Sequence, residues 1–294
     1  MRHYLKKIVD AEFVNAPFKH LYIENFFDRE DFDLLQQCKL NRLPPYDNTA
    51  ALIDGLRSNH YNPIDFPGCV KDINQYISSY QSGMFDGRDP EHETVVESYG
   101  MAFKQDVDNN PVARVRQLMS FMNSREFHVI VKHKFDLFDR PTRLSSTIQK
   151  YLSGYEISPH PDIRPKALTF LININPYDQM DQQDIHTHIL QFKPEYKYVQ
   201  HYWETHSVER DWVPWSWCNT VKVASENNSL LMFSPSCDTL HAVKLNYDHL
   251  KWQRTQIYGN LWYDDNQPRM PKMYYRDIPN EQTRLDSCKA DSTN

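Results

Sequence analysis

Histidine and carboxylate side chains that could bind a metal occur in two parts of this sequence. His160-Pro161-Asp162 lies between two segments that are rich in strand-forming residues. Alternate residues of an extended chain point to the same side, so His160 and Asp162 share a face. His241 follows a later apolar segment, SLLMF. Two histidines and one carboxylate on one face of an octahedron are typical of Fe(II) sites that keep positions open for other ligands.

A basic side chain follows the second histidine on the next strand-like segment, residues 252–263. A dicarboxylate that binds iron at one end needs a cation at its other end, and the planar fork of arginine suits a carboxylate. Lys251 is closer in sequence to His241, but Arg254 begins the better strand and shares its polar face with Gln256. These residue types therefore predict an iron site with Arg254 as the anchor of a dicarboxylate.

The elements that must position these residues are mainly strands. Alternating or β-rich patterns predict strands at 127–138, 147–157, 167–175, 186–192, 221–224, 229–233 and 254–263. A short strand is predicted at 20–27, helices at 29–40, 70–81 and 112–123, and loop at 41–68. Helices followed by many strands indicate an α+β chain that is mainly β.

Bulk composition excludes several classes of protein. A net charge of −6 over 294 residues gives no global attraction to nucleic acid or to an anionic membrane. The seven glycines form neither GxGxxG nor a P-loop, which argues against nucleotide-binding folds built on those motifs. Five scattered cysteines, no signal-peptide pattern and no apolar run of membrane-spanning length predict a reduced, cytoplasmic protein.

Several segments together resemble a known family. YLSGYEISPHPD (151–162) is similar to the YxxG…PHxD block of the prolyl-4-hydroxylase-like branch of the Fe(II)- and 2-oxoglutarate-dependent oxygenases. ALTFLININ (167–175) resembles the strand that follows in that branch, and NSLLMFSPSCDTLHAV (228–243) resembles its distal-histidine strand. LYIENFFDREDFDLL (21–35) is similar to its opening strand and helix. The pieces occur in the family's order, which is more specific than any one of them.

The resemblance implies a fold and a domain plan. The fold would be a double-stranded β-helix, or jelly roll, with flanking N-terminal helices in one oxygenase domain over 1–294. Residues 1–125 would form the helical and loop flank, 126–265 the core with an insertion at 193–220, and 266–294 the tail.

The resemblance also implies the site and the chemistry. His160, Asp162 and His241 match the iron ligands of the family. Arg254, Tyr151 and Asn173 match positions that contact 2-oxoglutarate. The implied cofactors are Fe(II), 2-oxoglutarate and O2. Because related halogenases lack the carboxylate, Asp162 implies hydroxylation or another oxidation of a C–H bond.

Two features depart from the family pattern. MDQQDIHTHI (180–189) replaces the usual glycine pair, and its His186 and His188 could form a cupin-like metal pair or line the substrate pocket. The insertion holds four of the six tryptophans and could be either a lid over the substrate or a cover for the barrel.

Four functions remain open on the sequence. The first is an oxygenase that acts on a small molecule, and the second is one that acts on a protein or peptide side chain. The third is a cupin-like metal protein that does not use 2-oxoglutarate, and the fourth is a non-catalytic β-barrel binding module. The enclosed pocket that the aromatic insertion suggests favours the small-molecule oxygenase. The oligomeric state is not predicted.

Overall fold

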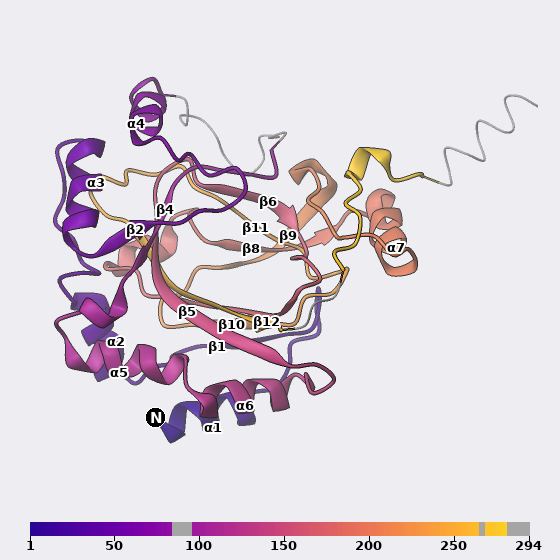
Figure 1. Ribbon diagram of the computed structural model, residues 1–294, viewed down its shortest axis with the longest axis horizontal. Helices are drawn as coiled ribbons and strands as arrows, with labels where there is room; N and C mark the ends of the chain where they lie inside the picture. The colour runs from indigo at the N-terminus through magenta and orange to yellow at the C-terminus, as the bar shows by residue number, and fades with distance from the viewer. Residues whose placement is uncertain (84–95, 265–267, 281–294) are drawn as a thin grey trace, which may run out of the picture.

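The computed structural model describes residues 1–83, 96–264 and 268–280. Its longer strands form two antiparallel sheets that lie one above the other, and helices α1, α2, α5 and α6 lie beneath the larger sheet (Figure 1). No helix in these ranges is long and apolar enough to cross a membrane.

The larger sheet has seven strands. In spatial order they are β1 (His20–Ile23), β10 (Leu230–Phe233), β7 (Lys166–Asn173), β12 (Arg254–Tyr263), β5 (Thr142–Tyr151), β4 (Ala102–Gln105) and β2 (Tyr61–Pro63). β12 is paired with β5 along its whole length and with β7 over most of it. Every second residue of β12 therefore faces the second sheet, beside the residues of β5 and β7 that are paired with it.

The smaller sheet has five strands. In spatial order they are β3 (Ser98–Tyr99), β6 (Glu156–His160), β11 (His241–Lys244), β8 (Thr187–Phe192) and β9 (Cys218–Ala224). His241 of β11 is the direct cross-strand partner of His160 of β6. The predicted metal ligands are thus brought together by strand pairing, although they lie far apart in the chain.

Helices cover the outer face of the larger sheet. They are α1 (Arg2–Asp10), α2 (Arg29–Gln37), α5 (Ala113–Met122) and α6 (Arg125–Lys134), whereas α3 (Thr49–Ser58) and α4 (Ile73–Gln81) lie to one side of the sheets, with α3 next to β2 (Figure 1). The main core forms between this layer and the sheet, where Phe170 and Ile257 meet Phe127. Burial of this apolar face holds the sheet in place, which leaves its opposite, more polar face free to line a cavity.

The insertion at 193–220 packs on the outer face of the smaller sheet. It contains helix α7 (Lys197–Thr205), which lies beside that sheet in Figure 1. Trp203, Val213 and Trp215 form one buried cluster with Leu190 of β8 and Ala242 of β11. The insertion is therefore an apolar cover for these strands.

Two parts of the sequence-based prediction are wrong. The strand expected at 127–138 is mostly helix α6, because Ser124 caps its first turn and Phe127 and Val131, four residues apart, are both buried. The loop expected at 41–68 contains helix α3, capped by the Asn48 side chain. The helices predicted at 29–40, 70–81 and 112–123 are present as α2, α4 and α5.

The other strand predictions agree in part. The strand predicted at 147–157 is the end of β5 and the start of β6 with a turn between them, and the strand predicted at 20–27 ends at Ile23. Strand β12 coincides with the predicted 254–263, and β7, β8 and β10 fall within a residue or two of their predicted ranges. The irregular tail is described only over 268–280, where η5 (Tyr275–Asp277) is a single 3-10 turn. Its residues 281–294 lie outside the described part of the chain.

Candidate metal centre

Three side chains from β6, its following turn and β11 converge on one point. Potential ligand atoms of His160, Asp162 and His241 all lie within 4.8 Å of one another. His160 Nε2 is 3.5 Å from Asp162 Oδ1, and His241 Nε2 is 3.8 Å from Asp162 Oδ2. Among the described residues this is the one group of three or more such side chains with metal-ligand geometry.

The two imidazoles are fixed in the tautomer that a metal requires. His160 Nδ1 is 2.9 Å from the Ser158 carbonyl oxygen, and His241 Nδ1 is 3.0 Å from the Thr239 carbonyl oxygen. A carbonyl only accepts, so each Nδ1 carries the hydrogen and each Nε2 presents a lone pair to the centre. Burial, together with the neighbouring His160, lowers the pKa of His241 to about 3, which keeps this ring neutral.

Asp162 is held as a carboxylate in an unusual backbone position. Its φ of 61° is in the left-handed region, which aspartate tolerates better than most residues. Thr169 Oγ1 donates to Oδ2 at 2.6 Å, and Lys166 Nζ donates to Oδ1 at 2.6 Å. Burial alone raises the pKa of this carboxyl, but the adjacent ammonium group of Lys166 holds it well below its usual range. The sequence did not point to Lys166 and Thr169, because their contact with the Asp162 carboxylate depends on the backbone turn at Asp162.

A cavity of about 240 Å³ between the two sheets contains this centre. His160 and His241 line it from the smaller sheet, and Lys166 and Arg254 line it from the larger sheet. Its uncharged polar lining includes Gln149, Tyr151, Tyr155, Thr187, Gln256 and Tyr258. The two ligand histidines and the predicted anchor therefore line one cavity, and Asp162 lies directly behind His160 and His241.

Arg254 is the buried cation of this cavity. Its side chain is 1% exposed, it lies 4.6 Å from the ring centre of Tyr151, and its Nη2 donates to Thr187 at 3.3 Å. Its Nε is buried without a hydrogen-bond partner among the described residues. Lys251, the alternative anchor, is exposed and paired with Asp248 at 3.1 Å. The structure thus places Arg254, and not Lys251, in the cavity.

The other two predicted 2-oxoglutarate contacts differ in position. Tyr151 lines the cavity and donates its hydroxyl hydrogen to Gln149 at 2.7 Å. Burial raises the pKa of this phenol well above its usual range, so it remains a donor. Asn173 does not line the cavity; its amide bonds to Gln256 and to the Ala224 carbonyl. Gln256, which the sequence placed on the same polar face as Arg254, reaches the cavity instead.

The HTH segment does not form a second metal pair. His188 bonds to Asp184 at 2.9 Å and to Thr220 at 3.0 Å, whereas His186 Nε2 donates to the Met180 carbonyl. Of this triplet, only Thr187 lines the cavity. No residue of the insertion 193–220, all of which is described, lines it either. The structure therefore supports the role of barrel cover and not that of a lid.

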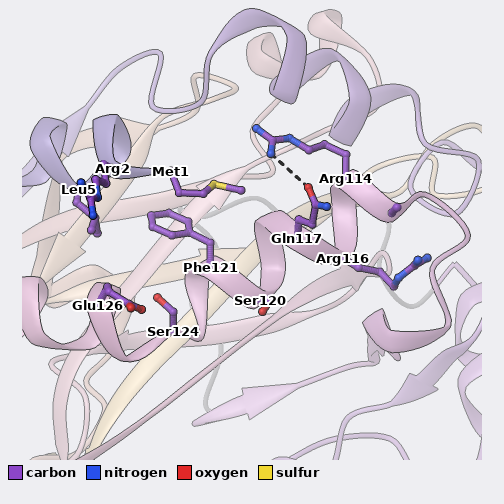
Figure 2. Close-up of a pocket in the computed structure, with 11 residues that line it drawn as sticks. Met1, Arg2, Leu5, Arg114, Arg116, Gln117, Ser120, Phe121, Ser124 and Glu126 are labelled. Atoms are coloured by element: carbon purple, nitrogen blue, oxygen red, sulfur yellow. Dashed lines mark hydrogen bonds between the residues drawn. The ribbon is translucent and has the colours of Figure 1, made fainter.

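A larger hollow elsewhere lacks metal-binding chemistry. It measures about 720 Å³ and lies between α1 and α5, and Figure 2 shows its lining, with Arg114 hydrogen-bonded to Gln117. Arg114 is also paired with Asp31 at 2.7 Å. The described lining includes one carboxylate, Glu126, and no histidine or cysteine. The cavity between the sheets is therefore the candidate site.

The sequence matches no protein-family model and no curated protein. Among solved structures, a prolyl-4-hydroxylase from Pseudomonas putida is similar at 10% identity and a TM-score of 0.41, over 89% of this chain and 96% of the other. HygX from Streptomyces hygroscopicus, with nickel and 2-oxoglutarate bound, is similar at 9% identity and a TM-score of 0.37, over 95% and 99%. The α-ketoglutarate-dependent epimerase SnoN from nogalamycin biosynthesis is similar at 8% identity and a TM-score of 0.38, over 93% and 95%. Scores below 0.5 assign neither fold nor activity.

The chemistry of this site follows from its own side chains. Two imidazole nitrogens and one carboxylate oxygen lie close enough together to act as three ligands of one divalent cation. Arg254 has an unsatisfied Nε in the same cavity, which an anionic group would satisfy. The residues of this centre fit a divalent metal ion held by His160, Asp162 and His241, with a dicarboxylate bound between that ion and Arg254.

Proposed function

We propose that this protein is an Fe(II)- and 2-oxoglutarate-dependent oxygenase that oxidises a C–H bond of a small molecule. The observation that carries the proposal is the convergence of a His-Asp-His triad and a buried, incompletely paired arginine on one cavity of about 240 Å³. Two histidines and a carboxylate leave half of an octahedron for a co-substrate and O2. The cation suits the distal carboxylate of 2-oxoglutarate.

The proposed fold is a double-stranded β-helix with N-terminal helices, in one domain. The strand order supports it, because from β5 to β12 the chain crosses from one sheet to the other at every step except between β8 and β9. Such a barrel places the metal ligands on the smaller sheet and the arginine on the larger one, across the same interior.

Each residue then has a part in binding. His160, Asp162 and His241 would hold the ion, with Thr169 and Lys166 orienting the carboxylate of Asp162. Arg254 would pair with the far end of 2-oxoglutarate, and the phenol of Tyr151 would donate to it in place of its present bond to Gln149. Bound Fe(II) and 2-oxoglutarate supply the oxidising chemistry, in which O2 is consumed and 2-oxoglutarate becomes succinate and CO2.

The test is turnover of 2-oxoglutarate without a known substrate. Anaerobic protein would be loaded with Fe(II) and 2-oxoglutarate, its metal-to-ligand absorption band recorded, and succinate measured after air is admitted. We expect the wild type to give both signals, His160→Ala to lose both, and Lys251→Met to behave as the wild type. Arg254→Met should lose the band at 2-oxoglutarate concentrations that saturate the wild type, because its cation is absent. If folded, metal-loaded wild type gives neither band nor succinate, the proposal is wrong.

The same experiment separates the proposal from a cupin-like metal protein. That alternative needs the triad but no cation for a co-substrate. Its signature would be Fe(II) binding that depends on His160, with no change in absorption when 2-oxoglutarate is added.

A further inference from the structure

We infer that the substrate of this site carries one anionic group, a carboxylate, that binds the ammonium group of Lys166. The inference rests on the proposed function and specifies its substrate class. It follows from three features of the cavity: its charge, its volume and the position of Lys166.

Lys166 is an additional buried cation beside the metal ligands. Its side chain is 12% exposed and lines the cavity, with Nζ 2.6 Å from Asp162 Oδ1 and 3.1 Å from the Tyr258 hydroxyl. A lysine ammonium has three N–H donors. Two are used here, and among the described residues the third has no hydrogen-bond partner.

The charges of the loaded site do not balance without an additional anion. Asp162 and the two carboxylates of 2-oxoglutarate contribute three negative charges. A divalent ion, Arg254 and Lys166 contribute four positive charges, and the ligand histidines are neutral. One positive charge therefore remains in a largely buried space, where an unpaired charge is costly. A substrate with one carboxylate would neutralise it.

The inner cavity is too small to hold much of the substrate. Its volume of about 240 Å³ is below the roughly 300–1,000 Å³ of pockets that enclose a drug-sized ligand. 2-Oxoglutarate, with about ten non-hydrogen atoms, would take up much of that room. The rest of the substrate must lie outside it.

A second, outer groove begins where the inner cavity ends. It measures about 910 Å³ and shares Ile64, Gln149 and Tyr258 with the lining of the inner cavity. Its charged lining is balanced, with Lys104 and Arg116 against Asp106 and Asp108. The excess positive charge therefore stays at Lys166 and is not neutralised by the groove.

Lys166 stands at the junction of these two spaces. Its Nζ is 5.8 Å from the ring centre of Tyr258, which lines both, and 5.5 Å from that of Trp262, which lines the groove. A substrate lying in the groove would pass Lys166 on its way to the metal. Its carboxylate would bind there with the reacting carbon directed to the centre.

Strand addition of a peptide to the groove is disfavoured. The open edge of β5 faces this groove, but Asn123 already bonds to both the N–H and the carbonyl of Ser146. Ser146 lies near the middle of this edge, so an added strand would first have to displace the Asn123 side chain. The groove therefore suits a small molecule better than an added peptide strand.

The test compares two probes of matched size and shape, butyrate and butyramide. Each would be titrated into the anaerobic Fe(II) protein at saturating 2-oxoglutarate, and the metal-to-ligand band would be followed by absorption and circular dichroism. We expect butyrate to shift the band saturably. Butyramide should bind at least about tenfold more weakly, because a hydrogen bond to a charged group contributes at least that factor to affinity. Equal effects of the two probes on the wild type would overturn the inference.

Variants identify the cation responsible. Lys166→Gln keeps a donor for Asp162 but removes the charge, so it should abolish the preference for butyrate, and Lys166→Arg should restore it. Lys104→Gln is the matched control in the groove and should keep the preference. Loss of preference in Lys104→Gln, or its survival in Lys166→Gln, would contradict the role of Lys166. If the wild type shows no band with 2-oxoglutarate, the proposed function itself fails; a band without discrimination refutes only the anionic substrate.

Discussion

Thr169 donates its hydroxyl hydrogen to Oδ2 of Asp162 at 2.6 Å, and both side chains are almost fully buried. The two residues belong to different elements, since Asp162 lies in the turn after β6 and Thr169 lies on β7. The bond fixes the plane of a carboxylate whose backbone is in the left-handed region. Outer partners of this kind set the orientation of a metal ligand.

Replacing Thr169 by valine should therefore weaken metal binding. Valine keeps the shape of the side chain but leaves Oδ2 of Asp162 without this donor, and loss of such partners costs about 10- to 100-fold in metal affinity. Titration of Co(II) into metal-free protein would measure it. Thr147→Val on β5 is the control, because its hydroxyl bonds to the Gln105 carbonyl, away from the triad. Equal Co(II) affinity in wild type and Thr169→Val would contradict this role.

Arg254→Lys should separate charge from geometry in 2-oxoglutarate binding. Lysine keeps the positive charge but loses the planar fork, so we expect the KM for 2-oxoglutarate to rise about tenfold or more with Co(II) affinity unchanged. Succinate formation at varied 2-oxoglutarate would give the KM. A KM equal to that of the wild type would show that Arg254 does not make a bidentate contact.

We expect the buried side chain of His249 to make the folded protein less stable as the pH falls. Its Nδ1 accepts the Ser153 N–H at 3.0 Å, so protonation would place two hydrogens face to face. Burial lowers the pKa of His249 to about 3, against an unfolded value near 6.5. Below pH 6.5 the unfolded chain takes up a proton that the folded protein does not, so the free energy of unfolding falls, by up to about 1.4 kcal/mol per pH unit.

Denaturant unfolding between pH 7 and pH 4.5 would measure this dependence. His249→Gln should be less stable at pH 7 but should lose less stability on acidification than the wild type. Exposed His206→Gln should follow the wild-type slope. Identical slopes for His249→Gln and the wild type would rule out His249 as a source of the acid sensitivity.

Much of the site could be predicted from the sequence, because strand periodicity and residue chemistry agree there. Strand β12 was predicted to the residue, since polar residues that face inward alternate along it with Ile257 and Leu261, which belong to the core on the helix side. The role of Lys166 could not be predicted, because it depends on the positive φ of Asp162, and aspartate adopts that conformation only in particular turns.

Helix α6 shows why part of the flank was predicted wrongly. Its sequence, REFHVIVKHK, is rich in β-branched and aromatic residues, and local propensity favours a strand. Two features outweigh that preference: the Ser124 cap, and the packing of Phe127 and Val131 in the main core between the helices and the larger sheet. Tertiary contacts decide such segments, and a single sequence does not show them.

We expect the insertion at 193–220, which covers the smaller sheet, to stabilise the fold without contacting the site, and Trp203 provides the test. It is fully buried against Phe192 at a ring separation of 5.9 Å. Trp203→Ala should lower the free energy of unfolding by about 3–5 kcal/mol, as for other large core truncations. Co(II) affinity of the folded fraction should stay at the wild-type value. A large loss of affinity in folded Trp203→Ala would instead favour direct contact with the site.

His160 and His241 are cross-strand partners, so a metal bound by both would also affect how long the protein stays folded. An ion bound by both residues would join β6 to β11 as a removable cross-link across a long stretch of chain. Chelation would cut this link and raise the frequency with which the smaller sheet opens, so proteases would cleave the chain faster. The bound ion would then set the lifetime of the folded chain in the presence of a protease.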